Sequence, residues 1–221
     1  MIDSAALLDD LKRELKTLET DLRVRAEDRN SVWGARLRDE YQRAQAKERT
    51  GLSWIDWRNG EVAQAGVAWI IATVFVRFSE DNGLLIGAIK DGRAVAQPWI
   101  AAPGDGLERA VENEAAFYAA TPTRTSRDWL QQAFSTLADL PAGGPLVDRA
   151  HSAVWHSEIS ATASDELLAF FRRTKPDGTL VHDFSYPDLG TRFLGDLYQD
   201  LSDHAKKTYA LLQTPEFVEE F

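Results

Sequence analysis

The sequence Val62-Ala-Gln-Ala-Gly-Val-Ala-Trp-Ile-Ile-Ala-Thr-Val-Phe-Val-Arg-Phe78 decides the fold, because its apolar side chains leave almost no polar face at helical spacing. A helix that is hydrophobic on all sides lies in the middle of a bundle. The apolar run at residues 65–76 is shorter than the ~20 residues that a membrane-spanning helix needs. We therefore predict a central buried helix over residues 54–81, ended by Asn82-Gly83, which tolerates a left-handed cap.

The first segment predicts an amphipathic helix with one apolar stripe. Leu8, Leu11, Leu15, Leu18 and Leu22 recur at alternating spacings of three and four residues, so they share one face. This leucine stripe either docks on the core of the chain itself or forms a coiled coil with a partner. The stripe is at the lower length limit for a coiled coil, so docking on the chain's own core is the favoured interpretation.

The remaining segments also favour helices, which are predicted over residues 32–47, 107–120, 128–140, 165–173 and 188–206. Glycines and prolines in residues 84–106 indicate a long connection that begins with a short strand or hairpin. We expect Ser126 to cap the helix that follows it. Pro176-Asp-Gly178 is expected to join two short strands. The predicted fold class is mainly α, a multi-helix bundle with at most a small β-hairpin or short strands.

The pattern divides the chain into an amphipathic helical arm (1–50), a helical core (51–186) and closing helices (187–221). The sequence contains no cysteine, which excludes disulfides and thiolate metal sites. Its first thirty residues are charged throughout, unlike a signal peptide. We therefore expect a cytoplasmic protein that has no membrane partner.

The charge distribution limits how this chain can contact DNA. The formal net charge is −10, and residues 1–50 are balanced, so the acidic excess lies in residues 51–221. Because phosphate contacts by Lys and Arg dominate nucleic-acid affinity, the chain alone is expected to bind DNA poorly. The best candidate for a DNA-binding face is Arg36, Arg43 and Lys47, which fall near one side of the second helix. The competing interpretation is a solvated face balanced by neighbouring acids.

No catalytic motif stands out in the sequence. Glycine-rich phosphate loops and the nucleophile elbow are absent, and the glycine pairs lie in proline-rich turns. His151 and His156 are not at the helical spacing that brings two ligands to one face, so we expect no metal site. Three charged residues stand at the end of the central helix: Arg77, Glu80 and Asp81. We expect them to form an internal ion-pair network rather than a functional site. The tryptophans near the central helix are expected to be core residues rather than base-stacking platforms.

Two stretches resemble a known family. The first, Gln64–Leu85, ends in Arg-Phe-Ser-Glu-Asp-Asn-Gly and resembles the helix before the catalytic domain in adenine-specific DNA methyltransferases of the phage growth limitation (type 2 BREX) family. The second contains Leu194-Gly-Asp-Leu-Tyr198 and, further on, Thr214-Pro215. It resembles the entry to the catalytic domain in such enzymes. The resemblance covers essentially the whole chain and implies that the chain corresponds to the amino-terminal region of such a methyltransferase.

The resemblance implies a parent protein that transfers a methyl group from S-adenosylmethionine to adenine N6 in DNA during phage defence. Only Thr214 and Pro215 match cofactor-contacting positions of the family; the glycine-rich cofactor motif and the Asn-Pro-Pro-Tyr motif are absent. Residues 187–221 would then lead into a catalytic domain absent from this chain, with the last helix cut short. The chain alone is expected to be catalytically silent and to hold no metal.

The implied role is a helical accessory region that braces the carboxy-terminal methyltransferase domain of its own parent protein. Its expected partners are that domain, DNA through the parent protein, and other phage-defence proteins. The alternative function is a docking module that binds other components of the defence system through the leucine stripe and the acidic surface, without a direct role on DNA. A free-standing small enzyme is a third interpretation, disfavoured by the missing motifs.

Overall fold

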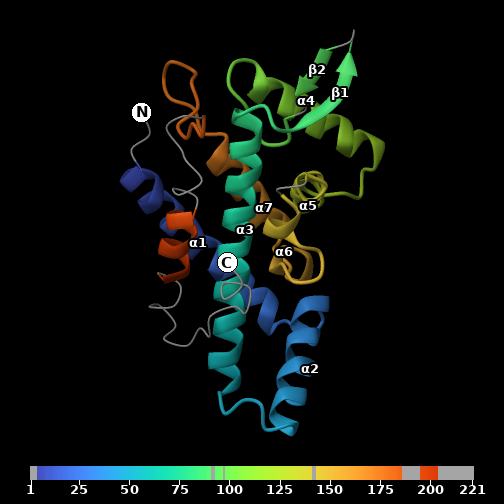
Figure 1. Cartoon of the computed structure of the whole chain (residues 1–221). Helices are drawn as coiled ribbons and strands as arrows, with labels where there is room; N and C mark the ends of the chain where they lie inside the picture. Colours follow the sequence, from blue (N-terminus) through green and yellow to red (C-terminus); the bar gives the residue numbers. More distant parts are fainter. Residues whose placement is uncertain (1–3, 91–92, 97, 141–142, 186–194, 204–221) are drawn as a thin grey trace.

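The computed structural model describes residues 4–90, 93–96, 98–140, 143–185 and 195–203 of the 221-residue chain. This part is mainly helical, with one short hairpin, which confirms the predicted fold class (Figure 1). Residues 195–203 also form a helix. The other elements are α1 (Ser4–Glu27), α2 (Val32–Ala46), α3 (Trp54–Asp81), β1 (Ile86–Lys90), β2 (Arg93–Ala96), α4 (Gly106–Ala120), α5 (Ser126–Ala138), the 3-10 helix η1 (Gly144–Val147), α6 (Ala153–His156) and α7 (Ala161–Phe171).

Helix α3 is the axis of the bundle, as its composition predicts. It runs through the middle of the molecule and packs against α1, α5 and α6 (Figure 1). The Ser53 hydroxyl caps its first turn by accepting the amide N–H of Asp56. By length and composition the whole 28-residue helix could cross a membrane, although its uninterrupted apolar run is shorter, but 78% of its most apolar window is buried inside the protein. Burial in the bundle therefore accounts for the composition of this helix.

The leucine stripe of α1 is buried against the bundle. Leu11, Leu15 and Leu22 have no exposed surface, and α1 packs along α3 and α7. At Gly66 of α3, a Cβ atom would lie 2.8 Å from the Leu15 side chain, so glycine permits this close helix approach. The stripe therefore docks on its own chain, and it is not available for a coiled coil with a partner.

Helix α2 and the first turns of α3 form a hairpin that projects from the bundle (Figure 1). Three of its side chains join the hairpin to the end of α1. The Glu27 carboxylate accepts hydrogen bonds from Trp54 Nε1 at 3.0 Å and from Arg38 Nη2 at 2.9 Å, and it also binds Arg58. The carboxy-terminal half of α2 is mostly exposed. This hairpin is thus anchored at one end and solvated at the other.

The long connection after α3 contains the predicted hairpin. Strands β1 and β2 are antiparallel, with Lys90 opposite Arg93 and an irregularity between Ile86 and Ala88. Farther along the chain, Thr174 and Leu180 form an isolated antiparallel bridge around the expected Pro176-Asp-Gly turn. Gly178 has φ +84°, the left-handed conformation that glycine adopts without steric cost.

Two helix starts differ from the sequence predictions. The residue that caps α5 is Thr125, whereas Ser126 is already in the first turn and donates to the Ala161 carbonyl oxygen. The Asp128 carboxylate accepts the Thr125 amide N–H at 2.7 Å, a reciprocal bond that places the cap one residue earlier and the helix start two residues earlier than predicted. Helix α7 begins at Ala161, because the Ser160 hydroxyl accepts the Ala163 amide.

A buried ion-pair network closes the carboxy-terminal end of α3, as predicted for Arg77, Glu80 and Asp81. The Arg77 side chain has no exposed surface and pairs with Asp81 at 2.7 Å and with Glu80 at 3.3 Å. The Glu80 carboxylate accepts the backbone amides of residues 99–101. The Asp81 carboxylate accepts the Phe184 amide at 2.7 Å. The network therefore ties α3 to two distant chain segments.

Candidate functional site

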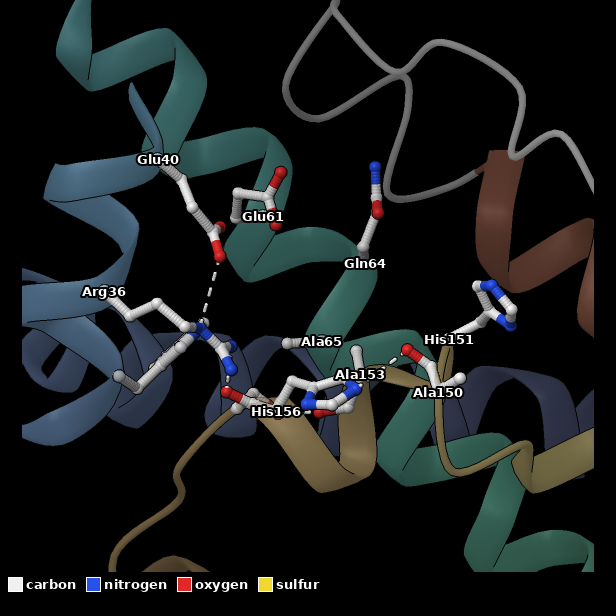
Figure 2. A pocket seen from close by; sticks show the side chains of 11 residues that line it. Arg36, Glu40, Glu61, Gln64, Ala65, Ala150, His151, Ala153 and His156 are labelled. Atoms are coloured by element: carbon white, nitrogen blue, oxygen red, sulfur yellow. Dashed lines mark hydrogen bonds and ion pairs between the residues drawn. The ribbon is translucent and has the colours of Figure 1, made fainter. Parts of the chain in front are cut away.

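A polar pocket lies between the hairpin and the bundle. Its volume is about 330 Å³. Three elements supply its walls: α2, α3 and the segment 150–157, which includes α6 (Figure 2). The lining residues are Trp33, Arg36, Glu40, Glu61, Gln64, Ala65, Ala150, His151, Ala153, His156 and Ser157.

The side chain of Arg36 extends from α2 into this pocket. Its guanidinium donates to the His156 carbonyl oxygen, a contact between residues 120 positions apart. Its Nε atom lies 3.4 Å from Glu40 Oε1, one helical turn farther along α2. Figure 2 shows the guanidinium between these two acceptors. Arg36 therefore links the hairpin to α6 and compensates the charge of Glu40.

Glu61 enters the pocket from α3, facing Glu40 (Figure 2). The pKa of its carboxyl group is raised to about 7, mainly by burial and also by the nearby charge of Glu40, while the charge of Arg36 opposes the shift. Within the described part of the chain, the Glu61 carboxyl has neither a hydrogen bond nor an ion pair. The pocket thus contains a carboxyl group that is about half ionised at neutral pH.

The two histidines of the pocket are held by different contacts. His156 Nε2 lies 3.0 Å from the Ala150 carbonyl oxygen, which can only accept, so this nitrogen carries a proton. His151 is exposed, and its Nδ1 lies 2.9 Å from Asp148 Oδ1. Across the described residues, no three His, Cys, Asp or Glu side chains are placed to hold a metal ion. Neither histidine is part of a metal centre in this region.

The structure separates the three residues proposed for DNA binding. Arg36 is half-buried in the pocket and engaged with His156 and Glu40. Arg43 is exposed and lies 3.8 Å from Asp39, and Lys47 is exposed at the end of α2. Arg43 and Lys47 therefore share the solvated end of the hairpin, whereas Arg36 faces its anchored end. DNA binding by this helix remains a prediction.

The two residues proposed to contact the cofactor, Thr214 and Pro215, lie outside the described residues. The other histidine of interest, His182, packs on the Phe170 ring and contacts Arg173 at 3.0 Å. Burial lowers the pKa of its imidazole to about 4, and the positive charge of Arg173 adds to this effect. His182 is consequently neutral at physiological pH and acts in packing.

Sequence analysis did not identify Glu40 and Glu61 as site residues. One feature of the sequence does point to Glu61. It is an acidic residue beside Val62 and Ala63, which are both fully buried in α3. A charge in an otherwise apolar helix needs a compensating partner. The position of Ala150 and His156 opposite Glu61 depends on a long-range contact, which no local pattern in the sequence reports.

Comparisons with known proteins address the family of the chain. No protein-family model matches it, and no solved structure matches it. Among curated proteins, it is similar to the adenine-specific methyltransferase PglX of Streptomyces coelicolor, with 44% identity over 229 residues. The matched region covers 100% of this chain but 18% of the relative, so the chain spans about a fifth of that protein's length. The resemblance inferred from the sequence is thereby confirmed: over its entire length, the chain is homologous to one region of the adenine-specific methyltransferase PglX.

Proposed function

We propose that this chain is the helical, non-catalytic accessory region of an S-adenosylmethionine-dependent DNA N6-adenine methyltransferase of a bacterial phage-defence system. The observation that carries the proposal is 44% identity along the entire chain to one region of PglX. In this proposal the region belongs to the amino-terminal part of the parent protein and braces its methyltransferase domain.

The architecture of the described residues supports a bracing role. The chain has its own core around α3, and a fully buried Arg77 fixes the far end of that helix. A rigid element of this kind positions a neighbouring domain more precisely than a loop does. The sequence lacks the glycine-rich cofactor motif and the Asn-Pro-Pro-Tyr motif, so the chemistry is assigned to another domain of the parent protein.

The alternative role, docking other defence-system proteins through the leucine stripe, is not favoured. Leu11, Leu15, Leu18 and Leu22 are buried against the bundle and present no surface to a partner. The same hypothesis also uses the acidic surface of residues 51–221, which the burial of the leucine stripe does not affect. The bracing role therefore accounts for more of the observed structure.

A domain exchange tests the proposal. In the Streptomyces relative, the region matched by this chain is deleted, or replaced by this chain, and N6-methyladenine in the host DNA is measured by methylation-sensitive sequencing. We expect deletion to abolish methylation and the replacement to restore it. Deletion without effect on methylation would contradict the bracing role.

The isolated chain provides the second arm of the test. Calorimetric titration with S-adenosylmethionine is expected to show no binding, and incubation with DNA and the cofactor no methyl transfer. Micromolar affinity for the cofactor would show that the chain itself holds a cofactor site, which contradicts its accessory role.

A further inference from the structure

The pocket between α2, α3 and α6 has an imbalance of charge that concerns Glu61. Glu40 and Glu61 both face the pocket, but the structure supplies one guanidinium, that of Arg36, for the two carboxyl groups. Arg36 is 3.4 Å from Glu40 and also donates to the His156 carbonyl oxygen. Its hydrogen bonds are therefore directed away from Glu61, and within the described part of the chain no cation forms a direct ion pair with this second carboxyl group.

Glu61 is half-buried, and a carboxylate that loses part of its hydration without gaining a partner is costly, so proteins compensate such a charge by protonation or by a partner. Protonation is one solution here, since burial raises the pKa of Glu61 to about 7. A cation in the pocket is the other solution. Groups with raised pKa values in a cavity are concentrated at functional sites, because structural carboxylates are normally paired by the fold itself.

The remaining walls suit an organic cation better than the alternatives. The indole of Trp33 and the methyl groups of Ala65 and Ala153 offer apolar and aromatic contact, and the Gln64 side chain offers an amide oxygen. An aromatic face attracts ammonium and guanidinium groups. An anion would meet two carboxyl groups, and the described residues supply no metal-binding cluster. The volume of about 330 Å³ accommodates one such group with its alkyl chain.

We propose that this pocket binds one organic cation, an ammonium or guanidinium group, with the Glu61 carboxylate as its counter-ion. The group comes either from a free small amine or from a Lys or Arg side chain that a protein partner presents. Binding exchanges the proton of Glu61 for the cation: the O–H bond of the carboxyl group breaks, and the proton passes to the buffer. This proposal does not depend on the assignment to a methyltransferase.

The experiment titrates the intact chain with ethylguanidinium at pH 8, where Glu61 is mostly ionised, and with the neutral isostere N-ethylurea. Chemical shifts of the backbone amides near Glu61 and Gln64 report binding. We expect saturable shifts with ethylguanidinium and none with N-ethylurea. Calorimetry at pH 7 in two buffers of different ionisation enthalpy is expected to show proton release on binding.

Glu61→Gln is the test variant, and it keeps the shape of the side chain. It is expected to weaken ethylguanidinium binding at least roughly tenfold, or about 1.4 kcal/mol, and to abolish the proton release. Glu112→Gln, in an exposed acid of α4, is the matched control and should bind as the wild type does. Thermal unfolding of both variants confirms that they are folded.

A Gly-Ser peptide with one central arginine separates the two sources of the cation. Binding tighter than that of ethylguanidinium supports a side chain from a protein partner, whereas equal affinity supports a free amine. Binding that persists in Glu61→Gln, or no saturable binding by the folded wild type at pH 8, would overturn the proposal.

Discussion

Arg77 joins the carboxy-terminal end of α3 to two distant segments of the bundle. It lies in the Arg-Phe-Ser-Glu-Asp-Asn-Gly stretch that carries part of the family resemblance. In the structure, this stretch forms the buried network with Glu80, Asp81 and the carbonyl oxygens of residues 101 and 182. The motif therefore has a structural role, because its three charged side chains pair with one another and bind backbone groups of two distant segments.

Replacing Arg77 by Met is expected to destabilise the protein by about 3–5 kcal/mol, since Glu80 and Asp81 would remain buried without their cation. Urea unfolding followed by circular dichroism measures this change. Arg43→Ala, in an exposed ion pair, serves as the control and should change stability by less than about 0.5 kcal/mol. A loss below about 1 kcal/mol for Arg77→Met would mean that the network adds little to stability.

Glu61 also predicts a pH dependence of stability. Its pKa is about 7 in the folded protein and 4.5 as the unperturbed value, so the folded state binds the proton more tightly. The stabilisation from this proton is fully present below pH 4.5 and is lost as pH rises through about 7. The shift limits the effect to roughly 3 kcal/mol. Glu61→Gln should therefore be more stable than the wild type at pH 8, with little difference at pH 4.

Glu14 on α1 contributes in the same pH range, because burial and the nearby charge of Glu166 raise its pKa to about 7. Unfolding free energies of the wild type, Glu61→Gln and Glu14→Gln, measured between pH 4 and 9, separate the two contributions. Identical pH profiles for Glu61→Gln and the wild type would show that Glu61 does not hold the proton in the folded state.

At the level of elements, local sequence patterns predicted most of the fold. The bounds of α3 and the leucine stripe follow from apolar spacing, which depends on the chain alone. The starts of α5 and α7 were misplaced, because Thr125, Ser160 and Asp128 compete for backbone amides in ways that spacing does not reveal. The four-residue helix α6 escaped prediction for another reason: Trp69 on α3 donates to Ser157 directly after it, so tertiary contacts hold it in place.

The pocket was less predictable than the helices around it. Arg36 was recognised as a basic residue on α2, but its contact is a carbonyl oxygen 120 residues away. The sequence of α2 gives no indication that His156 lies beside Arg36 in the folded chain. An exposed phosphate contact and an internal hydrogen bond give the same local pattern, and packing alone decides between them.

The packing of α1 on α3 gives a prediction at this scale. Leu15 is fully buried beside Gly66, so Leu15→Ala leaves a cavity and is expected to cost about 2–5 kcal/mol. Val24→Ala, on the same helix but with a 66% exposed side chain, should cost far less. Denaturant unfolding compares the two. Equal losses would indicate that α1 is not docked on α3 in solution.

The whole molecule is acidic, with a net charge of −10, and this charge limits what its basic residues can do. The acidic excess lies in residues 51–221, whereas the exposed end of α2 carries Arg43 and Lys47. An acidic protein repels phosphate over about a Debye length of ~8 Å at physiological salt. Arg43 and Lys47 belong to the half of α2 that projects from the bundle (Figure 1).

We predict that the isolated chain binds duplex DNA no tighter than the ~10⁻⁴–10⁻⁶ M of nonspecific binding. In the parent protein, charge reversal of Arg43 and Lys47 to Glu should reduce the salt slope of DNA affinity by nearly one unit per lost phosphate contact. Arg13 and Lys16, exposed on α1, are the matched control. Reversal of Arg36 is less informative, because it also breaks the bond to His156. An unchanged slope would exclude phosphate contacts by α2.

The Arg77 network has a consequence for the synthesis of the chain. The Arg77 guanidinium donates a hydrogen bond to the His182 carbonyl oxygen, 105 residues later in the sequence. The Asp81 carboxylate accepts the amide N–H of Phe184. At a ribosomal rate of ~5–20 residues per second, α3 emerges roughly 5–20 s before its buried charges can be satisfied. During that interval Arg77 can pair with Glu80 and Asp81 in its own helix, but the hydrogen bonds of the network to residues 182 and 184 cannot form. We therefore expect a nascent chain that ends between residues 81 and 182 to expose the apolar surface of α3 and to bind chaperones, until residues 182 and 184 complete the network.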